Sequence, residues 1–203
     1  MILYFNNKKI LFIHIPKTGG TTIERYFCEL MKINQFKYPT FYQEYLWGLG
    51  KNKLQYQHLT MKQIFNDLKL YKLDDFDFIF TVVRDPIKRF ISECNWRPQR
   101  YHNPQNLIDK IHDKSKRKNS HFFSQYDFIK GYENKLKIYK FEDGINNIVN
   151  DVIEVNKFNI NMPNLKYIKK SKILINDLSK KYKDEILKVF LKDFIIFEYD
   201  TNF

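Results

Sequence analysis

Short apolar stretches along the chain predict four β-strands. Residues 10–15 (ILFIHI) and 76–83 (FDFIFTVV) are runs rich in aliphatic and aromatic side chains, and a proline-containing turn follows each of them. Runs of this length and composition are typical of buried strands. Residues 54–59 (LQYQHL) and 135–141 (KLKIYKF) predict two more strands.

Stretches with helical periodicity follow these strands. Apolar residues recur three and four positions apart after Thr21, which predicts a helix there. Thr60 and Gln63 have the spacing of a capping box, in which the two residues satisfy each other's backbone N–H groups at a helix start. Pro86 suits the first turn of a third helix. The predicted helices cover residues 21–31, 60–71, 87–96, 105–113, 144–156 and 177–192.

This order of elements predicts the fold class. Strands that alternate with helices are typical of α/β proteins, in which helices cover both faces of a largely parallel sheet. We therefore expect a three-layer α/β fold. No internal repeat or low-complexity linker interrupts residues 1–203, so we expect a single domain. Residues 36–52 show no clear periodicity, and residues 97–119 read as a polar loop around one short helix.

Lysine dominates the charged residues and gives the chain a formal net charge of +12. Only six of the 35 basic residues are arginine, although arginine is the residue that most often contacts phosphates and bases through two parallel hydrogen bonds. A solvated lysine surface and a basic cleft for anionic ligands explain the charge equally well.

The two cysteines and the apolar runs indicate where the protein resides. Cys28 and Cys94 lie in predicted helices without the spacing of a metal or redox motif, so we expect reduced, buried thiols and no bound metal. The apolar run at residues 10–15 is too short for a signal peptide. No run approaches the ~20 apolar residues of a membrane span. The sequence therefore predicts a soluble, cytoplasmic protein.

The stretch HIPKTGGTT (14–22) joins the first predicted strand to the first predicted helix. A strand, a glycine-containing turn and a helix start together aim backbone N–H groups at an anion. The two glycines allow close backbone approach, the two threonines supply hydroxyl groups, and Lys17 adds positive charge. In a Walker A loop the lysine follows the glycines. The reversed order here disfavours an ATP- or GTP-hydrolysing loop, and a tight structural turn is the alternative.

A second turn between a strand and a helix, RDP at residues 84–86, is charged. Arg84 and Ser92 are eight residues apart, about two helical turns, so both reach one phosphate only if the chain bends suitably. By spacing Arg89 is the nearer helical residue. Spacing alone leaves these possibilities open, and a structural ion pair between Arg84 and Asp85 is another.

Together, FIHIPKTGGTT (12–22) and VVRDPIKRFISECNW (82–96) resemble the two nucleotide-binding motifs of carbohydrate sulfotransferases, the group that contains the heparan sulfate 2-O- and 6-O-sulfotransferases. KFED (140–143), MPNLKYIKKS (162–171) and the ending DFIIFEY (193–199) resemble the later part of that family. The resemblance implies a P-loop-like α/β fold. It also implies metal-independent sulfuryl transfer from 3′-phosphoadenosine 5′-phosphosulfate, or PAPS, to a hydroxyl group, expected on a carbohydrate.

The resemblance also implies which residues bind the donor. The first motif would hold the 5′-phosphosulfate, and the second would hold the 3′-phosphate. Lys170, in the basic loop 162–171, would close over the nucleotide, although a solvated lysine is an equal alternative. The implied donor-binding residues are Lys17, Thr18, Gly19, Gly20, Thr21, Thr22, Arg84, Ser92 and Lys170.

The reaction needs a general base for the acceptor hydroxyl, and a neutral histidine suits this task near pH 7. A catalytic histidine of the heparan sulfate 2-O-sulfotransferase occupies a place similar to that of His58, so the resemblance assigns His58 as the base. It also assigns Lys17 the role of stabilising the negative charge that develops on the leaving oxygen. We expect a structural role for His14, and Glu24 is a weaker candidate base. We expect three further histidines at the surface: His102, His112 and His121.

Other functions fit the sequence less well. A nucleic-acid-binding protein would agree with the net charge, but no RNP, zinc-finger or helix-turn-helix signature is present. A nucleotide kinase with a variant loop would need a Mg²⁺-binding carboxylate, and Asp85 is the one evident at a predicted strand end. The aromatic stretch around Tyr42, Tyr45 and Trp47 suits either sugar stacking or core packing.

Overall fold

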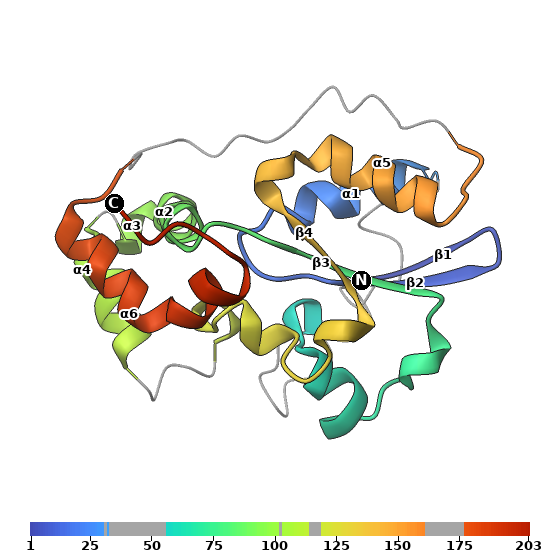
Figure 1. Cartoon of the computed structure of the whole chain (residues 1–203), viewed down its shortest axis with the longest axis horizontal. Helices are drawn as coiled ribbons and strands as arrows, with labels where there is room; N and C mark the ends of the chain where they lie inside the picture. The colour runs from blue at the N-terminus through green and yellow to red at the C-terminus, as the bar shows by residue number, and fades with distance from the viewer. Residues whose placement is uncertain (31, 33–55, 102, 114–118, 161–176) are drawn as a thin grey trace.

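A computed structural model describes the chain except for residues 31, 33–55, 102, 114–118 and 161–176 (Figure 1). In the described part, four strands form one sheet in the order β1-β2-β3-β4. Strand β2 pairs in parallel with β3, and β3 pairs in parallel with β4, whereas β1 is antiparallel to β2. The strands are β1 (Ile2–Phe5), β2 (Lys8–Ile13), β3 (Phe78–Val83) and β4 (Lys137–Lys140).

Strand β1 is an element that the sequence pattern did not predict. It forms a hairpin with β2 in which Phe5 pairs with Lys8. The two residues between them, Asn6 and Asn7, have φ values of 48° and 59°. Two-residue hairpin turns favour positive φ at both central positions, and asparagine tolerates this conformation better than most residues. The Asn-Asn pair was therefore the available sequence signal for this hairpin.

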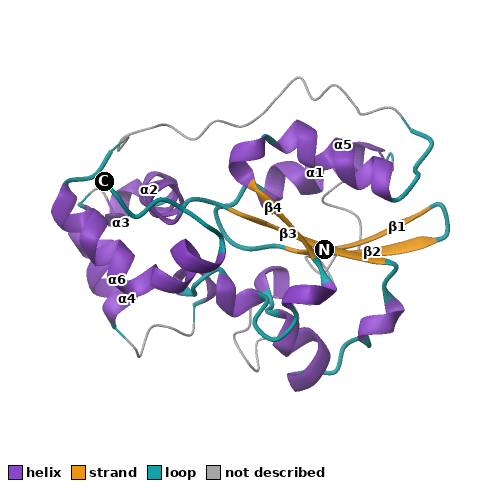
Figure 2. Ribbon diagram, in the orientation of Figure 1, coloured by secondary structure: helices purple, strands orange, loops and turns teal. Residues whose placement is uncertain are grey.

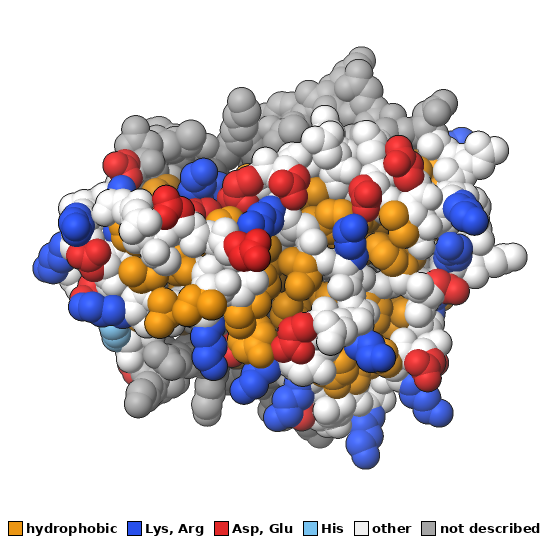
Figure 3. Space-filling view, viewed as in Figure 1, with side chains coloured by type: hydrophobic (Ala, Val, Ile, Leu, Met, Phe, Trp, Pro, Cys, Tyr) orange, Lys and Arg blue, Asp and Glu red, His pale blue; other side chains and the backbone are white. Residues whose placement is uncertain are grey.

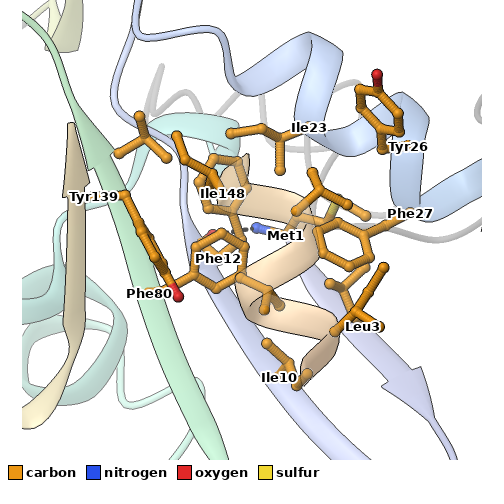
Figure 4. Close-up of a cluster of buried hydrophobic side chains, with 14 of the residues drawn as sticks. Met1, Leu3, Ile10, Phe12, Ile23, Tyr26, Phe27, Phe80, Tyr139 and Ile148 are labelled. Carbon is orange, nitrogen blue, oxygen red and sulfur yellow. Dashed lines mark hydrogen bonds between the residues drawn. The ribbon is translucent and has the colours of Figure 1, made fainter. Parts of the chain in front are cut away.

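Helices α1 (Gly20–Leu30) and α5 (Ile145–Val155) cover one face of the sheet (Figure 2). Their apolar faces pack on side chains from all four strands. Figure 4 shows this core, in which Phe12 and Phe80 stack at 4.8 Å between ring centroids, with Ile23 of α1 and Ile148 of α5 above them. The packing fixes the start of α1 directly above the end of β2.

Short helical segments cover the opposite face. Residues 56–58 and 63–67 form a 3-10 and a π-helical turn, and Met61 and Ile64 are buried there against Leu11 and Ile79 of the sheet. The predicted strand at 54–59 is therefore wrong for its described residues, because Tyr56–His58 is helical.

A third cluster of helices lies beyond the carboxyl ends of β2 and β3 (Figure 2). Helix α2 follows β3 directly, and Ile186, Phe190 and Phe194 of α6 lie in the same apolar core as Phe90 of α2. The helices are α2 (Pro86–Trp96), α3 (Pro98–Tyr101), α4 (Pro104–His112) and α6 (Lys180–Ile196).

The expected fold class is confirmed: a largely parallel sheet lies between helical layers. The capping box at Thr60 is confirmed as well, since the Thr60 N–H donates to Gln63 Oε1 at 2.9 Å and the Gln63 N–H donates to Thr60 Oγ1 at 3.1 Å. The predicted end of this helix at residue 71 is wrong, because the helical segment ends at Asp67. Cys28 and Cys94 are buried free thiols, as expected. Within the described ranges, no helix combines the length and the apolar character that crossing a bilayer requires.

Candidate functional site

The loop after β2 has a constrained backbone. Lys17 and Gly19 have positive φ values of 69° and 85°, a region that glycine adopts easily and lysine rarely. The Thr18 hydroxyl donates to the carbonyl of Ile15 at 2.9 Å, and Thr18 is fully buried. The Thr18 side chain therefore stabilises the turn from inside.

Both glycines of the loop lie where a side chain has no room. A Cβ on Gly20 would lie 2.1 Å from the ring of His14, and a Cβ on Gly19 would lie 2.7 Å from Phe141 and 2.9 Å from Ile145. Close packing against these side chains explains why the loop carries two glycines in succession.

Helix α1 begins at Gly20, one residue before the predicted start. Thr21 is exposed and Thr22 is half-buried in its first turn. The first N–H groups of a helix have no intrahelical acceptors, and the helix dipole adds partial positive charge at this end. The loop and the first turn of α1 thus combine backbone donors, two hydroxyl groups and the Lys17 ammonium, which suits an anionic group.

The RDP turn after β3 is held on both sides. Asp85 caps α2, since its carboxylate accepts from the Lys88 N–H at 2.8 Å. The side-chain amide of Gln125 makes two hydrogen bonds to the backbone of Arg84: its oxygen accepts from the N–H and its nitrogen donates to the carbonyl, each at 2.8 Å. Asp193 in turn accepts from the N–H of Gln125 at 2.8 Å. The backbone of Arg84 is therefore fixed by α6.

The guanidinium of Arg84 joins the two turns. Its Nη1 donates to the carbonyl of Lys17 at 3.3 Å, and its carbon lies 4.4 Å from the centroid of the Phe141 ring. Its Nε is buried without a hydrogen-bond partner in the described part of the chain. Burial lowers the pKa of Arg84, while Glu142 and Asp85 act in the opposite direction. A buried donor without an acceptor is costly, and an anionic ligand would satisfy it.

Arg89, the other basic residue considered for this turn, is bound to the protein itself. Its guanidinium donates to the carbonyls of Pro16 at 3.0 Å, Phe123 at 2.9 Å and His121 at 3.3 Å. Arg89 therefore ties the loop after β2 to α2 and to the 121–123 segment.

For two of the expected donor-binding residues, Ser92 and Lys170, the structure shows no side-chain hydrogen bond to the other residues of the site in the part that it describes. Ser92 is half-buried on the face of α2 that also carries exposed Lys88, one turn earlier. No hydrogen bond joins Ser92 to Arg84 among the residues that the structure describes. Lys170 and the predicted loop around it lie outside the described residues, as do Tyr42, Tyr45, Trp47 and His102.

His58 lies buried beside the loop. Its Nδ1 is 2.8 Å from the carbonyl of His14, and because a carbonyl only accepts, Nδ1 carries the proton. In the neutral ring Nε2 then holds the free lone pair. Burial lowers the pKa of His58 well below its usual value, and the nearby rings of His14 and His121 add to this effect. His58 is therefore held in the tautomer and charge state that a base needs.

His14 and Glu24 form a buried pair below the loop. His14 Nδ1 lies 2.9 Å from the Glu24 carboxylate. Burial raises the pKa of Glu24, but the charge and hydrogen bond of His14 outweigh it and the net shift is downward. This agrees with the structural role expected for His14. The Glu24 carboxylate orients His14, the residue on which Gly20 packs.

His121 is not at the surface, contrary to expectation. Its ring is 5.3 Å from that of His58, and it stacks on Trp96 at 5.0 Å with an interplanar angle of 9°. Its Nδ1 lies 2.9 Å from the buried carboxylate of Glu93. The expectation failed because the partners of His121 are distant in sequence: Glu93 and Trp96 come from α2, and His58 comes from the 56–58 turn. His112 is exposed and pairs with Glu185, so that expectation is confirmed.

These contacts place two strand-to-helix turns side by side at the carboxyl ends of parallel strands, where α/β proteins bind their ligands. Such an arrangement is typical of α/β proteins that bind a ligand where strands lead into helices. The model of the sulfotransferase family matches residues 1–200, and the chain therefore belongs to the sulfotransferase family. It is a transferase. Searches of curated proteins and of solved structures gave no match.

Proposed function

We propose that the protein transfers a sulfuryl group from PAPS to a hydroxyl group on a carbohydrate. Membership of the sulfotransferase family supports sulfuryl transfer, and PAPS is the donor that this family usually uses. The observation that carries the proposal is the junction of the two turns, where Arg84 Nη1 contacts the Lys17 carbonyl and the buried Nε has no hydrogen-bond partner among the described residues.

The residues present fit the donor. The loop and the helix start after it supply backbone N–H groups for a 5′-phosphosulfate. In the proposal Lys17, Thr18, Gly19, Gly20, Thr21 and Thr22 hold this group. Arg84 and Ser92 hold the 3′-phosphate, and Lys170 contributes from its loop.

The donor, when bound, supplies an electrophilic sulfur and a phosphate leaving group. Lys17 stabilises negative charge at the leaving oxygen, a role for which a partly buried ammonium is well suited. His58 accepts the proton of the acceptor hydroxyl at Nε2, because its Nδ1 proton is committed to the His14 carbonyl. Positioning and charge stabilisation provide most of the catalysis in such group transfers.

Two features support a nucleotide site over a nucleic-acid surface. On the face shown in Figure 3, lysine and arginine side chains alternate with acidic and apolar ones and form no continuous basic stripe. Arg84 and Arg89 are both directed at the protein's own turns. The soluble, cytoplasmic setting and the absence of a bound metal expected from the sequence belong to this proposal as well.

Isothermal titration calorimetry tests the donor. We expect 3′-phosphoadenosine 5′-phosphate to bind at least tenfold more tightly than ADP, which lacks the 3′-phosphate, because only the former satisfies Arg84. Equal binding of the two nucleotides would contradict the proposal. A panel of sugars and simple alcohols with radiolabelled PAPS then tests the acceptor, and transfer only to non-carbohydrate hydroxyls would contradict the carbohydrate assignment.

A further inference from the structure

Three residues of the site have no role in the proposal above: Glu93, Trp96 and His121. They come from α2 and from the segment after α4, and they meet the loop after β2 at Lys17. The Lys17 ammonium lies 4.7 Å from the centroid of the Trp96 ring. Lys17, Glu93 and His121 also line one small pocket. The lysine of the first motif is thus held by a side chain at the end of the second motif.

Trp96 is itself held in place. Its indole stacks nearly parallel on His121, and His121 is fixed by its hydrogen bond to the buried Glu93. Arg97 lies over the same indole at 4.2 Å. A half-exposed tryptophan with an apolar neighbour would turn freely about two bonds, whereas this one has a fixed ring plane. The ring plane decides where a cation is attracted, because the negative face of the ring is the attractive part.

We propose that Trp96 is a positioning residue for the transfer reaction, and that the Glu93–His121 pair fixes its ring so that the ring face holds the Lys17 ammonium. The inference rests on the proposed function, since it concerns the lysine assigned to the leaving oxygen. It deepens that function by naming a residue that keeps the lysine in place before the donor arrives.

The charges around Lys17 support this arrangement. Burial lowers the pKa of Lys17 to about 8; Glu93 acts in the opposite direction, and Arg84 and Arg97 lower it further. The ammonium therefore loses its proton not far above neutral pH. A contact that favours the ammonium then changes how much of Lys17 is charged near this pH. Both the ring face of Trp96 and the carboxylate of Glu93 favour the protonated form.

Replacement of Trp96 by phenylalanine and by leucine distinguishes a cation–π contact with Lys17 from apolar shielding of Lys17 from water. Both side chains are apolar, but only phenylalanine keeps an aromatic face. Trp96 is 46% exposed, so both variants should fold. We expect W96L to weaken the binding of 3′-phosphoadenosine 5′-phosphate at pH 8 by about three- to thirtyfold, in line with the strength of a cation–π contact. We expect W96F to retain most of the affinity.

The pH dependence gives the decisive readout. Binding of 3′-phosphoadenosine 5′-phosphate should fall as the pH rises through the pKa of Lys17. In W96L and in E93Q this alkaline limb should move to lower pH, because each variant loses a contact that favours the ammonium. NMR of ¹³C-methylated lysines, with K17R to assign the signal, measures the same shift without ligand. The inference would be overturned if binding by W96F and W96L were lost at the same alkaline pH, or if the loss in W96L moved to higher pH.

The two proposals fail in different ways. If the wild-type protein does not bind the nucleotide at any pH, the proposed function fails, while the NMR titration of Lys17 still tests the contact with Trp96. If the wild-type protein binds and the Trp96 variants match it at every pH, the inference alone fails.

Discussion

One backbone carbonyl decides the chemistry available to His58. The His14 carbonyl accepts from Nδ1, so the lone pair is on Nε2 whenever the ring is neutral. Burial keeps the ring neutral to a lower pH than usual by lowering its pKa. A histidine arranged in this way needs no carboxylate partner to serve as a base, in contrast to His14 and His121, which are each bound to one.

Replacement of His58 by alanine tests its assignment as the base. Loss of a general base typically lowers the rate by ~10²–10⁴, and the same loss is expected here. The affinity for 3′-phosphoadenosine 5′-phosphate should change little, because His58 lies outside both motifs. Single-turnover transfer and calorimetric binding measure the two effects. K17A is the matched comparison and should impair both.

A near-normal rate in H58A would move the base to another residue. His121, which lies against the same ring, and Glu24 would then be next. Stability should also respond to His58: the unfolded chain takes up the proton near pH ~6.5, while the folded protein resists it. The unfolded state then binds more protons, so the contribution of His58 to stability falls as the pH drops below that value.

At the scale of elements, α2 connects the two motifs. It begins at the RDP turn, where Asp85 caps it, and Arg89 one turn later reaches back to the Pro16 carbonyl in the loop after β2. Glu93 and Trp96, one and two turns further, reach His121 and Lys17. A single helix therefore sets the distance between the turns, and its placement matters more than any one of its contacts.

Replacement of Arg89 by methionine should destabilise the protein by about 3 kcal/mol, because one buried and two partly buried carbonyls lose their donor and a buried loss costs ~1–3 kcal/mol. Lys88→Met on the exposed side of the same helix is the control and should change stability little. Urea denaturation measures both. A midpoint in R89M equal to that of the control would show that the three hydrogen bonds contribute little.

Individual elements also show what sequence reasoning could reach. The apolar runs of β2 and β3, and the turns after them, were predictable because their pattern and chemistry are local. The strand predicted at 54–59 failed for its described residues because Tyr56–His58 forms a short helical turn, in which His58 is bound to the His14 carbonyl. The pair Glu93–His121 spans 28 residues, and neither residue carries a local signal.

At the scale of the whole molecule, the site lies where the three apolar clusters meet. Phe141 and Ile145, beside Gly19, pack against the core under α1 and α5. Ile15, at the start of the loop, belongs to the core on the other face of the sheet. The pocket at Lys17 is lined by Phe90 and Phe190 of the helical cluster. A nucleotide bound there would contact elements from every part of the described fold.

Such a ligand should stabilise the molecule as one unit. At a hundred times its Kd, 3′-phosphoadenosine 5′-phosphate would add about 2.7 kcal/mol to the free energy of unfolding, and Tm would rise by roughly 5–10 °C for a chain of this size. Differential scanning calorimetry should show one transition that moves as a whole. Two transitions, of which only one moves, would contradict this and also the expectation of a single domain.

The side chain of Gln125 has a consequence for how the protein is made. Its amide pairs with the backbone of Arg84 as a neighbouring strand would, and the backbone N–H of Gln125 donates to Asp193 of α6, 109 residues after Arg84. During synthesis these contacts of the RDP turn form only after more than a hundred further residues have been added to the chain. Contacts between residues so distant in sequence slow folding. The RDP turn therefore reaches its final geometry only after α6 has docked.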